Sequence, residues 1–344
     1  MTARYANSDE IKRWNTLVLS NPDGGNIFSS FEYAEQKRMT GYKPVFIMVD
    51  DLAVTVLQKN TPPLGRLWYL PKGPGVKSAD ELIKAVNEIE ELARKAGVFV
   101  IKVESEIDLA EAGSLEKEGY IKSSPIIPNP STITLDISAD EDALLLSLPQ
   151  KGRHAIRRAE RDGVKVELAE ATDANCRLMY KLLQETAEGK FGVRNFAYFK
   201  EFWQSFEKAG LGQLFFAKHG DRVVAGAFAM VFGEKSTYKD GASIREKSAY
   251  GASHLLQWEV IKWAKSRGAV LHDFCGSPPS DQIENTEHPH YGIGRFKLSF
   301  SKNVVDYIGC YDKIINPNKY KLWKKGLERV YRSLYYRIKK DYYY

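Results

Sequence analysis

The chain has 344 residues, of which 43% are hydrophobic and 27% charged, and a formal net charge of +6. This length exceeds the usual size of one domain, so we expect two, and the composition is that of an ordinary globular protein. The three cysteines, Cys176, Cys275 and Cys310, show no CxxC spacing, which argues against a disulfide framework or a zinc site and favours a reducing compartment. The first residues lack the apolar core of a signal peptide, and no apolar run approaches the length of a membrane span. We therefore expect a cytoplasmic protein.

Most of the basic charge lies in two segments. Residues 151–161 contain five Lys or Arg and one Glu, residues 319–340 contain nine and one, and the rest of the chain has a net charge of −6. Such concentration favours a polyanionic partner. Two helices with solvated basic faces would give the same pattern, so the charge alone leaves both interpretations open.

The first half of the chain is predicted to consist of helices, strands, one long helix and a further strand. Ser8 is expected to cap an amphipathic helix, and a second short helix, SSFEYAEQKRM, should end at Gly41. Ser78 and Glu81 form a capping-box pattern before the long helix, which should stop at LARKAG. The expected strands are 44–49, 52–58, 66–70 and 98–103.

The second half repeats this order. Ser138 and Glu141 form another capping-box pattern, and we expect helices over 139–162, 173–188 and 196–209. The strands QLFFAKH, RVVAGAFAMVF and STYKDG follow, then a helix ending WAKSRG and the strand AVLHDF. WAKSRG-AVLHDF takes the place that LARKAG-VFVIKV has in the first half, so a whole α/β unit is repeated. Each unit is predicted to be a mixed sheet flanked by helices.

The stretch from Tyr250 to Gly309 has the layout of a functional site. Its helix is YGASHLLQWEVIKWAKSRG, its strand AVLHDF is broken by Cys275 and Gly276, and a long polar loop leads to the lysine of RFKLSF. A second strand, NVVDYIGCYDKII, closes the segment. Binding residues tend to lie on loops held by rigid elements, so the lone lysine between aromatic residues is a candidate.

The motifs of this stretch resemble those of the Fem-type (FemABX) aminoacyltransferases, which build the interpeptide bridges of bacterial peptidoglycan. The ordered series is YGAS, a helix with WAK, a strand ending Asp-Phe-x-Gly, Gly-x-Phe-Lys-x-x-Phe and Tyr-Ile-Gly. The resemblance implies an α/β protein of tandem, duplicated acetyltransferase-like (GNAT) domains with mixed sheets, whose C-terminal tail returns to the first domain. It implies a precursor-binding domain over residues 1–137 and 305–344, and a domain on the aminoacyl-tRNA side over residues 138–304. Sustained heptads are missing, so the chain resembles the compact members without a coiled-coil arm.

The resemblance assigns two residues to the acyl donor. Phe296 and Lys297 match the family's Phe-Lys motif, which engages the end of the aminoacyl-tRNA. Aminoacyl transfer from an ester passes through a tetrahedral oxyanion that a desolvated lysine would stabilise, and Phe296 would stack on a terminal base. Without the resemblance, Lys297 would be interpreted as an ordinary lysine with its aliphatic stem packed on apolar neighbours.

Four residues match the family's pocket for the peptidoglycan precursor. Lys37 corresponds to a lysine that grips a phosphate, Arg194 and Tyr198 are spaced as an Arg and a Tyr of that pocket, and Tyr250 takes the place of another substrate tyrosine. A guanidinium and a phenol four residues apart at a helix entrance can face one diphosphate. Each residue taken alone would be interpreted as an ordinary surface or core residue.

The segment QKGRHAIRRAERDG is predicted to be a helix with a continuous basic stripe that suits the backbone of tRNA. The stripe consists of Lys151, Arg153, Arg157, Arg158 and Arg161. The C-terminal tail is predicted to dock one apolar face on the core, which leaves its basic face for tRNA or for anionic lipid at a membrane surface. That apolar face consists of Trp323, Leu327, Val330, Leu334 and Ile338.

Motifs of several other chemistries are missing. Neither GxxxxGK[ST] nor HExxH occurs, so nucleotide hydrolysis and zinc hydrolysis have no support, and His288 and His290 are too few for a metal site. The turn SAYGAS stands where acetyltransferases hold the CoA pyrophosphate, but it lacks the first and last residues of their [QR]xxGx[GA] pattern. We therefore expect no metal and no cofactor.

The sequence thus predicts a monomeric, tRNA-dependent aminoacyltransferase. It would add an amino acid from aminoacyl-tRNA to the stem-peptide amine of a peptidoglycan precursor, either UDP-MurNAc-pentapeptide or lipid II. Glu104, Glu106 and Asp273 are candidates for a general base by strand-end position alone. Two alternatives stay open: a GNAT-type N-acyltransferase with another acyl donor, and a non-enzymatic RNA-binding protein that uses the basic stripe.

Overall fold

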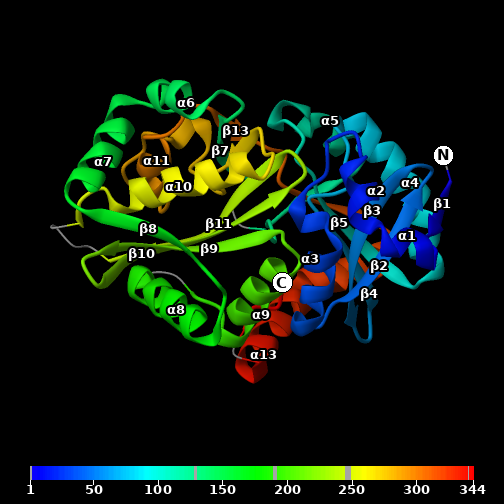
Figure 1. The fold of residues 1–344 in the computed structure, drawn as a ribbon. Helices are drawn as coiled ribbons and strands as arrows, with labels where there is room; N and C mark the ends of the chain where they lie inside the picture. The colour runs from blue at the N-terminus through cyan, green and yellow to red at the C-terminus, as the bar shows by residue number, and fades with distance from the viewer. Residues whose placement is uncertain (1, 128–129, 189–191, 245–248, 340) are drawn as a thin grey trace. The chain divides into compact units, whose positions relative to one another are not determined.

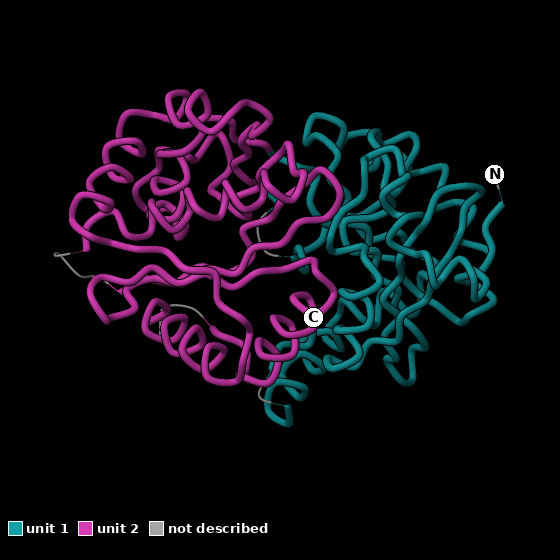
Figure 2. The backbone as a smooth tube through the Cα atoms, in the orientation of Figure 1, with its two compact units in different colours: residues 1–130, 306–344 teal, residues 131–305 magenta. Residues whose placement is uncertain are grey.

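The chain forms two compact units, which the computed structural model describes over residues 2–127, 130–188, 192–244, 249–339 and 341–344. The first unit consists of residues 1–130 and 306–344, and the second of residues 131–305 (Figure 2). Ser248 of the SAYGAS turn and Lys340 of the basic tail lie outside the described residues.

The first unit is built on a seven-stranded mixed sheet (Figure 1). In sheet order its strands are β1 (Ala3–Tyr5), β2 (Lys43–Val49), β3 (Leu52–Thr61), β4 (Gly65–Pro71), β5 (Val98–Glu104), β14 (Cys310–Ile314) and β6 (Ile121–Ser123). β4 and β5 run parallel, and the other neighbouring pairs run antiparallel. A parallel pair needs a crossover, which helix α4 (Ala79–Lys95) supplies. Leu82, Val86 and Ile89 recur at helical spacing along α4 and are fully buried in the core of this unit.

The other α-helices in the described part of the first unit are α1 (Ser8–Lys12), α2 (Trp14–Leu19), α3 (Phe31–Gln36), α5 (Ala112–Lys117), α12 (Pro317–Leu322) and α13 (Glu328–Lys339). The predicted cap of α1 is wrong by one residue. Asn7 caps this helix by accepting from the N–H groups of Asp9 and Glu10, and the Glu10 carboxylate accepts from the N–H of Asn7. The capping box needs an acid three residues after the cap, which Asn7 has in Glu10, whereas Ser8 is followed at that distance by an isoleucine.

The C-terminal tail returns to the sheet of the first unit, as the resemblance implies. β14 lies between β5 and β6 and pairs with both. Across this pairing, Lys102 Nζ lies 2.6 Å from Asp312 Oδ1, and the two side chains are only 3% and 1% exposed. Burial opposes the charged form of Lys102, but Asp312 outweighs it, and the pKa of this lysine is raised. Ser123 and Tyr320 donate to the same carboxylate, so the buried negative charge is held by hydrogen bonds as well as by the lysine.

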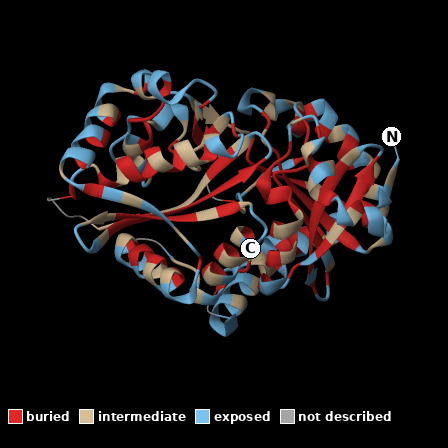
Figure 3. Ribbon diagram, viewed as in Figure 1, coloured by how far each residue is buried: buried red, intermediate tan, exposed pale blue. Residues whose placement is uncertain are grey.

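The predicted docking face of the tail is wrong beyond Trp323. Trp323 is 1% exposed, but Val330, Leu334 and Ile338 are 57%, 53% and 66% exposed (Figure 3). The helix is kinked between α12 and α13, in the segment Trp323–Leu327, where Gly326 has non-helical dihedral angles, a φ of 164° and a ψ of −20°. Such a break rotates the following helix relative to the preceding one. The residues one position later therefore face inward.

The side chains that dock α13 on its own unit are two tyrosines, one position after the predicted aliphatic residues. The Tyr331 ring lies 5.6 Å from that of Trp323, and its hydroxyl donates to the carbonyl of Pro62. The Tyr335 ring lies 5.6 Å from that of Tyr343.

The second unit is also built on a seven-stranded mixed sheet. In sheet order its strands are β13 (Val304–Asp306), β7 (Ser131–Asp136), β12 (Leu271–Asp273), β11 (Lys235–Ser243), β10 (Arg222–Phe232), β9 (Gly212–His219) and β8 (Val164–Ala169). β11 and β12 run parallel, whereas β8 to β11 run antiparallel to one another, as do β7 and β12. Helix α10 (Ala252–Ser266) makes the crossover between the parallel strands.

The other helices of the second unit are α6 (Glu141–Ser147), α7 (Gln150–Arg161), α8 (Asp173–Ala187), α9 (Phe196–Lys208) and α11 (Tyr291–Lys297). The single helix predicted over 139–162 is wrong, because it is two helices that separate before Pro149. Proline disfavours helical geometry in the residue before it, and Leu148 is extended. The predicted cap is wrong as well: Asp140 accepts from the N–H of Ala143, while Ser138 bonds to Asp136.

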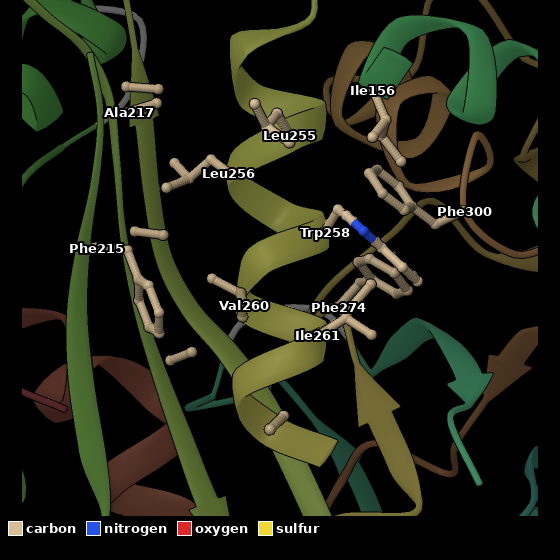
Figure 4. Close-up of a cluster of buried hydrophobic side chains, with 14 of the residues drawn as sticks. Ile156, Phe215, Ala217, Leu255, Leu256, Trp258, Val260, Ile261, Phe274 and Phe300 are labelled. Carbon is tan, nitrogen blue, oxygen red and sulfur yellow. The ribbon is translucent and has the colours of Figure 1, made fainter. Parts of the chain in front are cut away.

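Helix α10 fills the core of the second unit. Leu256 and Val260 point from one side of the helix toward the strands that carry Phe215, and Trp258 points toward Phe300 (Figure 4). Val260, Ile261 and Ala264 have no exposed surface. The helix is thus apolar on more than one side, as expected of a helix covered on several faces.

The two units share one arrangement: an antiparallel set of strands, a helix, and a strand parallel to the last one. β4–α4–β5 and β11–α10–β12 are the corresponding crossovers. The predicted fold class, a tandem α/β protein with two mixed sheets, is confirmed.

The segment after β12 differs from the prediction in two ways. The approach to Lys297 was expected as a loop, but residues 291–297 form α11. The single strand predicted over 303–315 is two strands, β13 and β14, which belong to different sheets. Gly309 separates them with a φ of 72°, a conformation that an extended strand cannot contain.

The buried pair of the first unit gives a stability prediction. Asp312→Asn removes the negative charge and leaves Lys102 buried without it, so the free energy of unfolding should fall by about 3–5 kcal/mol. Equilibrium unfolding in urea, followed by circular dichroism, measures this loss. Glu91→Gln is the control, because it breaks the exposed Lys95–Glu91 pair and should leave the unfolding midpoint unchanged. Equal midpoints for the two variants would contradict the assignment of a stabilising role to the Lys102–Asp312 pair.

Candidate active site

The centre of the candidate site is Lys297, the last residue of α11. Its side chain is buried, and its Nζ donates to the carbonyl oxygens of Cys275 and, at 2.5 Å, Gly276. These two residues form the turn after β12, and both have a positive φ, 59° and 70°. The ammonium group therefore satisfies the carbonyls of a turn that leaves the sheet at the end of the crossover strand.

Burial lowers the pKa of Lys297 to about 8, even though Cys275 and Asp273 favour the charged form. At neutral pH the side chain is still mainly cationic. A lysine ammonium has three N–H donors. Among the described residues, two of these donors have an acceptor, which leaves the third for a bound group. A cation in such a water-poor position interacts strongly with any negative charge that develops beside it.

Asp273, a candidate base, is used to build the turn. Its Oδ1 accepts from the Thr132 hydroxyl and from the N–H of Cys275, the latter at 2.7 Å. Both bonds hold a carboxylate rather than a carboxylic acid, because both partners donate. We infer that Asp273 shapes the Lys297 site.

Phe296 is half-buried and packs against an aromatic pair. Its ring lies 4.9 Å from that of His254 and 5.5 Å from that of Phe300, both edge to face. His254 in turn stacks on Phe300, with an interplanar angle of 20°. Burial, with a smaller contribution from Lys151, lowers the pKa of His254 to about 4, so this histidine is neutral at physiological pH.

The sequence analysis missed His254. Within the described part of the chain its buried Nε2 has no hydrogen-bond partner. No motif in the sequence marked this histidine, whose position depends on packing between α10 and the segment around Phe296 and Phe300.

The basic helix α7 packs directly against the elements that carry Lys297. A Cβ on Gly152 would lie 2.0 Å from the carbonyl oxygen of Ser299, and a Cβ on Gly251 would lie 2.2 Å from that of Ala155. Only glycine fits either position without movement of the backbone. The buried face of α7 therefore contacts both the start of α10 and the residues that follow Lys297.

Four residues of the predicted basic stripe lie on the exposed side of α7: Lys151, Arg157, Arg158 and Arg161. Arg153 differs from them, because its Nη1 donates to the carbonyls of Leu148 and, at 2.7 Å, Leu146, at the end of the preceding helix. Arg158 lies over the ring of Tyr250 at 5.0 Å and pairs with Asp162 at 3.2 Å. Because Arg158 covers its ring, the predicted substrate tyrosine, Tyr250, lies beside the stripe. Tyr250 itself is 42% exposed.

Arg194 and Tyr198 lie together at the start of α9. The guanidinium is 4.6 Å from the centroid of the Tyr198 ring, and Asn195 caps the helix between them. The sequence analysis missed Lys239. Its Nζ lies 3.0 Å from Asp240 Oδ1, and Tyr198 also favours its charged form. Burial opposes the charge of Lys239, but Asp240 outweighs it and the pKa is raised. The adjacent Lys-Asp pair in strand β11 carried no motif that would have revealed it.

In the first unit, Lys37 lies at the end of α3 and is 4% exposed, with its Nζ 5.1 Å from the centroid of the Tyr33 ring. An ammonium group over the face of a phenol ring is attracted by the ring electrons, so Tyr33 helps to position the Lys37 side chain.

Glu104 and Glu106 end strand β5 in a buried polar setting. The Glu104 carboxylate accepts from Tyr69 Oη at 2.5 Å and from two backbone N–H groups, and burial raises its pKa against the opposing effect of Lys72. Glu106 lies 3.6 Å from Lys72 Nζ, and its side chain is 12% exposed. Both carboxylates are thus tied to neighbours within the first unit.

No group of three or more His, Cys, Asp or Glu side chains that could hold a metal ion occurs among the described residues.

Comparison with known proteins gives one family. The model of the FemAB family matches residues 129–218 and 207–325, more than half of the chain. A curated relative, lipid II:glycine glycyltransferase of Staphylococcus aureus (strain MRSA252), is 22% identical over 93% of this chain and 95% of its own length. That alignment has 405 positions, more than this chain has residues, so the relative contains segments that the chain lacks.

Two solved structures have the same fold. The crystal structure of FemX matches with a TM-score of 0.79 and 20% identity over 95% of this chain and all of that one. A tandem GNAT protein from the clavulanic acid biosynthesis pathway matches with a TM-score of 0.50 and 13% identity over 92% of this chain and 98% of that one.

The contrast between buried Lys297 and partly buried Lys239 gives a test of the site. In spectra of protein labelled with 13C-lysine, Lys297 should titrate with a midpoint near pH 8, cationic below it and neutral above, because burial lowers its pKa. Lys239 should titrate above the ordinary lysine value of about 10.4, because Asp240 raises its pKa. Lys297→Met assigns the first signal by its loss.

The sign of the stability effect follows from the lowered pKa. Between pH of about 8 and about 10.4 the unfolded chain binds more protons at Lys297 than the folded chain, so its contribution to stability rises with pH. A Lys297 midpoint above about 10.4 would contradict the desolvated site.

Proposed function

The chain belongs to the FemAB family, and from this premise we propose that it is a tRNA-dependent aminoacyltransferase. It transfers an amino acid from aminoacyl-tRNA to the stem-peptide amine of a peptidoglycan precursor. The relatives named lipid II:glycine glycyltransferase support a precursor of this class, either lipid II itself or the soluble UDP-MurNAc-pentapeptide. A reaction that consumes charged tRNA takes place in the cytoplasm.

The observation that carries this proposal is the state of Lys297. The residue occupies the Phe-Lys motif, is buried, remains cationic near neutral pH and has one N–H donor beyond the two that bond to the turn. A donor held in place before the reaction costs no reorganisation when charge develops, which is the requirement for stabilising an oxyanion.

The proposed reaction is attack of the stem-peptide amine on the ester carbonyl of the aminoacyl-tRNA. The carbonyl oxygen becomes an oxyanion beside Lys297, the ester C–O bond breaks, and an amide forms. The amine loses a proton and the departing tRNA hydroxyl gains one, so the protons balance. The ester is already activated, and the chemistry needs no redox partner.

The other residues take roles in binding. Lys37, Arg194, Tyr198 and Tyr250 are proposed to hold the precursor, with the two cations on its diphosphate. Phe296 is proposed to contact the terminal base of the tRNA through the ring surface that His254 and Phe300 leave open. Of these, Lys37 belongs to the first unit, whereas Arg194, Tyr198 and Tyr250 belong to the second unit, which would also bind the tRNA.

The basic stripe of α7 is proposed to hold the tRNA backbone. Its position supports this role, because the opposite face of the same helix packs on the segment that follows Lys297. Arg157 and Arg161 are both exposed; Arg161 Nε lies 4.0 Å from Asp162 Oδ1, whereas Arg153 is bonded to carbonyls and Arg158 pairs more closely with Asp162, at 3.2 Å.

A product assay tests the function and the role of Lys297 together. The protein is incubated with a mixture of charged tRNAs and either precursor, with acetyl-CoA as the alternative donor, and the products are weighed by mass spectrometry. We expect one added aminoacyl residue. In Lys297→Ala, both substrates should still bind, while kcat and kcat/KM fall together by about 100–1000-fold, because the lost interaction is made only in the transition state.

Matched variants separate catalysis from folding. Lys297→Ala also leaves two carbonyls of the turn without a donor, so it should melt at a lower temperature, whereas Lys302→Ala removes an exposed lysine nearby and should change neither property. Lys297→Arg should not restore turnover, because a planar guanidinium does not replace an ammonium in this position. Normal turnover by folded Lys297→Ala would overturn the mechanism, and transfer from acetyl-CoA alone would overturn the function.

Salt dependence tests the stripe. Replacing Arg157 and Arg161 by Gln should weaken tRNA binding regardless of sequence and reduce the slope of log K against log salt by about one for each phosphate that the variant no longer neutralises. Filter binding at several salt concentrations measures both the affinity and the slope. Lys181 and Lys208, both exposed on α8 and α9, provide a control pair with the same change of charge. Equal slopes for the two double variants would assign the stripe to a solvated helix face.

A further inference from the structure

Helix α13 presents an apolar stripe to solvent. Val330, Leu334 and Ile338 follow one another at intervals of four residues, which places them on one face of the helix. Their exposures of 57%, 53% and 66% are high for aliphatic side chains. An aliphatic row exposed in this way marks a binding surface more often than it marks a solvated helix.

The orientation of this stripe is fixed by a neighbouring face of the helix, about 100° away. Tyr331 and Tyr335 pack on Trp323 and Tyr343, and these contacts lie within the first unit. The helix is therefore held by its tyrosines and cannot turn its aliphatic row inward without breaking those contacts.

Basic side chains surround the stripe. Arg337 lies three residues after Leu334 and shares its side of the helix, and Arg329 precedes Val330. Both are exposed, as are Lys321, Lys325 and Lys339. Within the described part of the tail, a carboxylate partner is found for Lys324 alone, at 3.1 Å from Glu328. Tyr344 Oη also donates to that carboxylate at 2.8 Å, so the one acidic residue of the tail between 319 and 340 is engaged internally.

We propose that α13 binds the surface of a bilayer that contains anionic lipid, with Val330, Leu334 and Ile338 inserted among the acyl chains and the surrounding Lys and Arg side chains at the headgroups. An apolar face bordered by cations is the pattern of a helix that lies in the interface rather than across it. Across the described ranges, no helix is long and apolar enough to cross a membrane. The charge of the tail is complementary to anionic headgroups, and each cation near such a surface strengthens the attraction.

The same charge could face RNA, but the aliphatic row favours lipid. Phosphates along a nucleic acid backbone would be bound by the arginines and lysines alone. Three aliphatic side chains pointing outward would remain in water in such a complex. In α7, the proposed tRNA-binding helix, the apolar residues Ala155, Ile156 and Ala159 are instead fully buried and the exposed face is polar.

Bilayer binding is independent of the proposed reaction, because it needs neither substrate nor turnover. Its consequence for the reaction does depend on the proposed function: a protein held at the bilayer would reach a lipid-linked precursor in the plane of the membrane.

Vesicle flotation of the full chain, without substrates, tests the proposal. The protein should float with vesicles of phosphatidylcholine containing about 30% phosphatidylglycerol, bind pure phosphatidylcholine far less, and detach as salt is raised to about 0.5 M. Replacing Val330, Leu334 and Ile338 by Ser should weaken binding at least about tenfold. Replacing Arg329 and Arg337 by Gln should weaken it about fivefold for each charge.

Matched controls isolate α13. Leu146 and Leu168 are exposed leucines of the second unit, 63% and 57%, and their replacement by Ser should leave flotation unchanged. Lys84→Gln with Lys117→Gln removes two exposed charges from the first unit and should have a smaller effect than the arginine pair. Leu334→Trp should bind several times more tightly, since Trp favours the interface, and a gain of this kind does not result from misfolding.

Three results would overturn the proposal. The serine triple variant could float as well as the wild type, or Leu334→Trp could bind no better than Leu146→Trp. Alternatively, the arginine variant could keep its affinity for vesicles and lose affinity for tRNA, which would make α13 a nucleic-acid surface. Loss of transfer activity with normal flotation would instead count against the proposed function alone.

Discussion

A buried ammonium group bonded to two carbonyl oxygens holds the candidate site together. Lys297 joins α11 to the turn at Cys275 and Gly276, and this turn directly follows the crossover strand of the second unit. Removing the lysine would leave the turn carbonyls without donors inside the protein, which is costly. The position of the Lys297 ammonium group is therefore set by the turn that follows the crossover strand, and this turn is held by the sheet.

Three lysines show why Lys297 differs from a structural ion pair. Lys102 lies beside Asp312 and Lys239 beside Asp240, and in both the carboxylate outweighs burial and raises the pKa. Lys297 bonds to neutral carbonyls, and burial outweighs the effects of Cys275 and Asp273 on its pKa. A lysine paired directly with a carboxylate has its charge compensated, whereas the ammonium group of Lys297 bonds to carbonyl dipoles. Such a charge is available to compensate an anion that forms next to it.

Hydrophobic periodicity and the repeated helix–strand order predicted the tandem α/β units, whereas the return of the tail to the first domain was predicted from the family resemblance. The crossovers around α4 and α10 depend on long apolar faces, which periodicity reveals well. Predictions of smaller features were wrong where neighbouring residues could both cap a helix. Asn7 and Asp140 are as good caps as the serines chosen instead; Ser8 lacks the acid that Asn7 has three residues later, and Ser138 has that acid but bonds to Asp136. The prediction for the tail was wrong for a different reason, since the kink at Gly326 rotates the following helix and the periodic pattern does not reveal it.

Site residues were predictable only where a motif carried them. Lys297 and Phe296 belong to an ordered series, but nothing local in the sequence indicates that His254 would stack beside Phe296 or that Arg153 would bond to the end of the preceding helix. Those contacts depend on packing between segments far apart in the chain.

Close packing of backbones in the second unit links the basic helix to the segment that follows the buried lysine. Gly152 and Gly251 allow backbones to touch where any side chain would collide, so α7 has no space in which to move independently of the residues after Lys297. Protein interiors packed to this density transmit displacement instead of absorbing it. If α7 holds the donor RNA, as proposed, its distance from the catalytic cation is fixed by backbone contact and does not rely on flexible side chains. Correct placement of the reacting ester would then follow from binding the RNA at a defined position on the outer face of the helix.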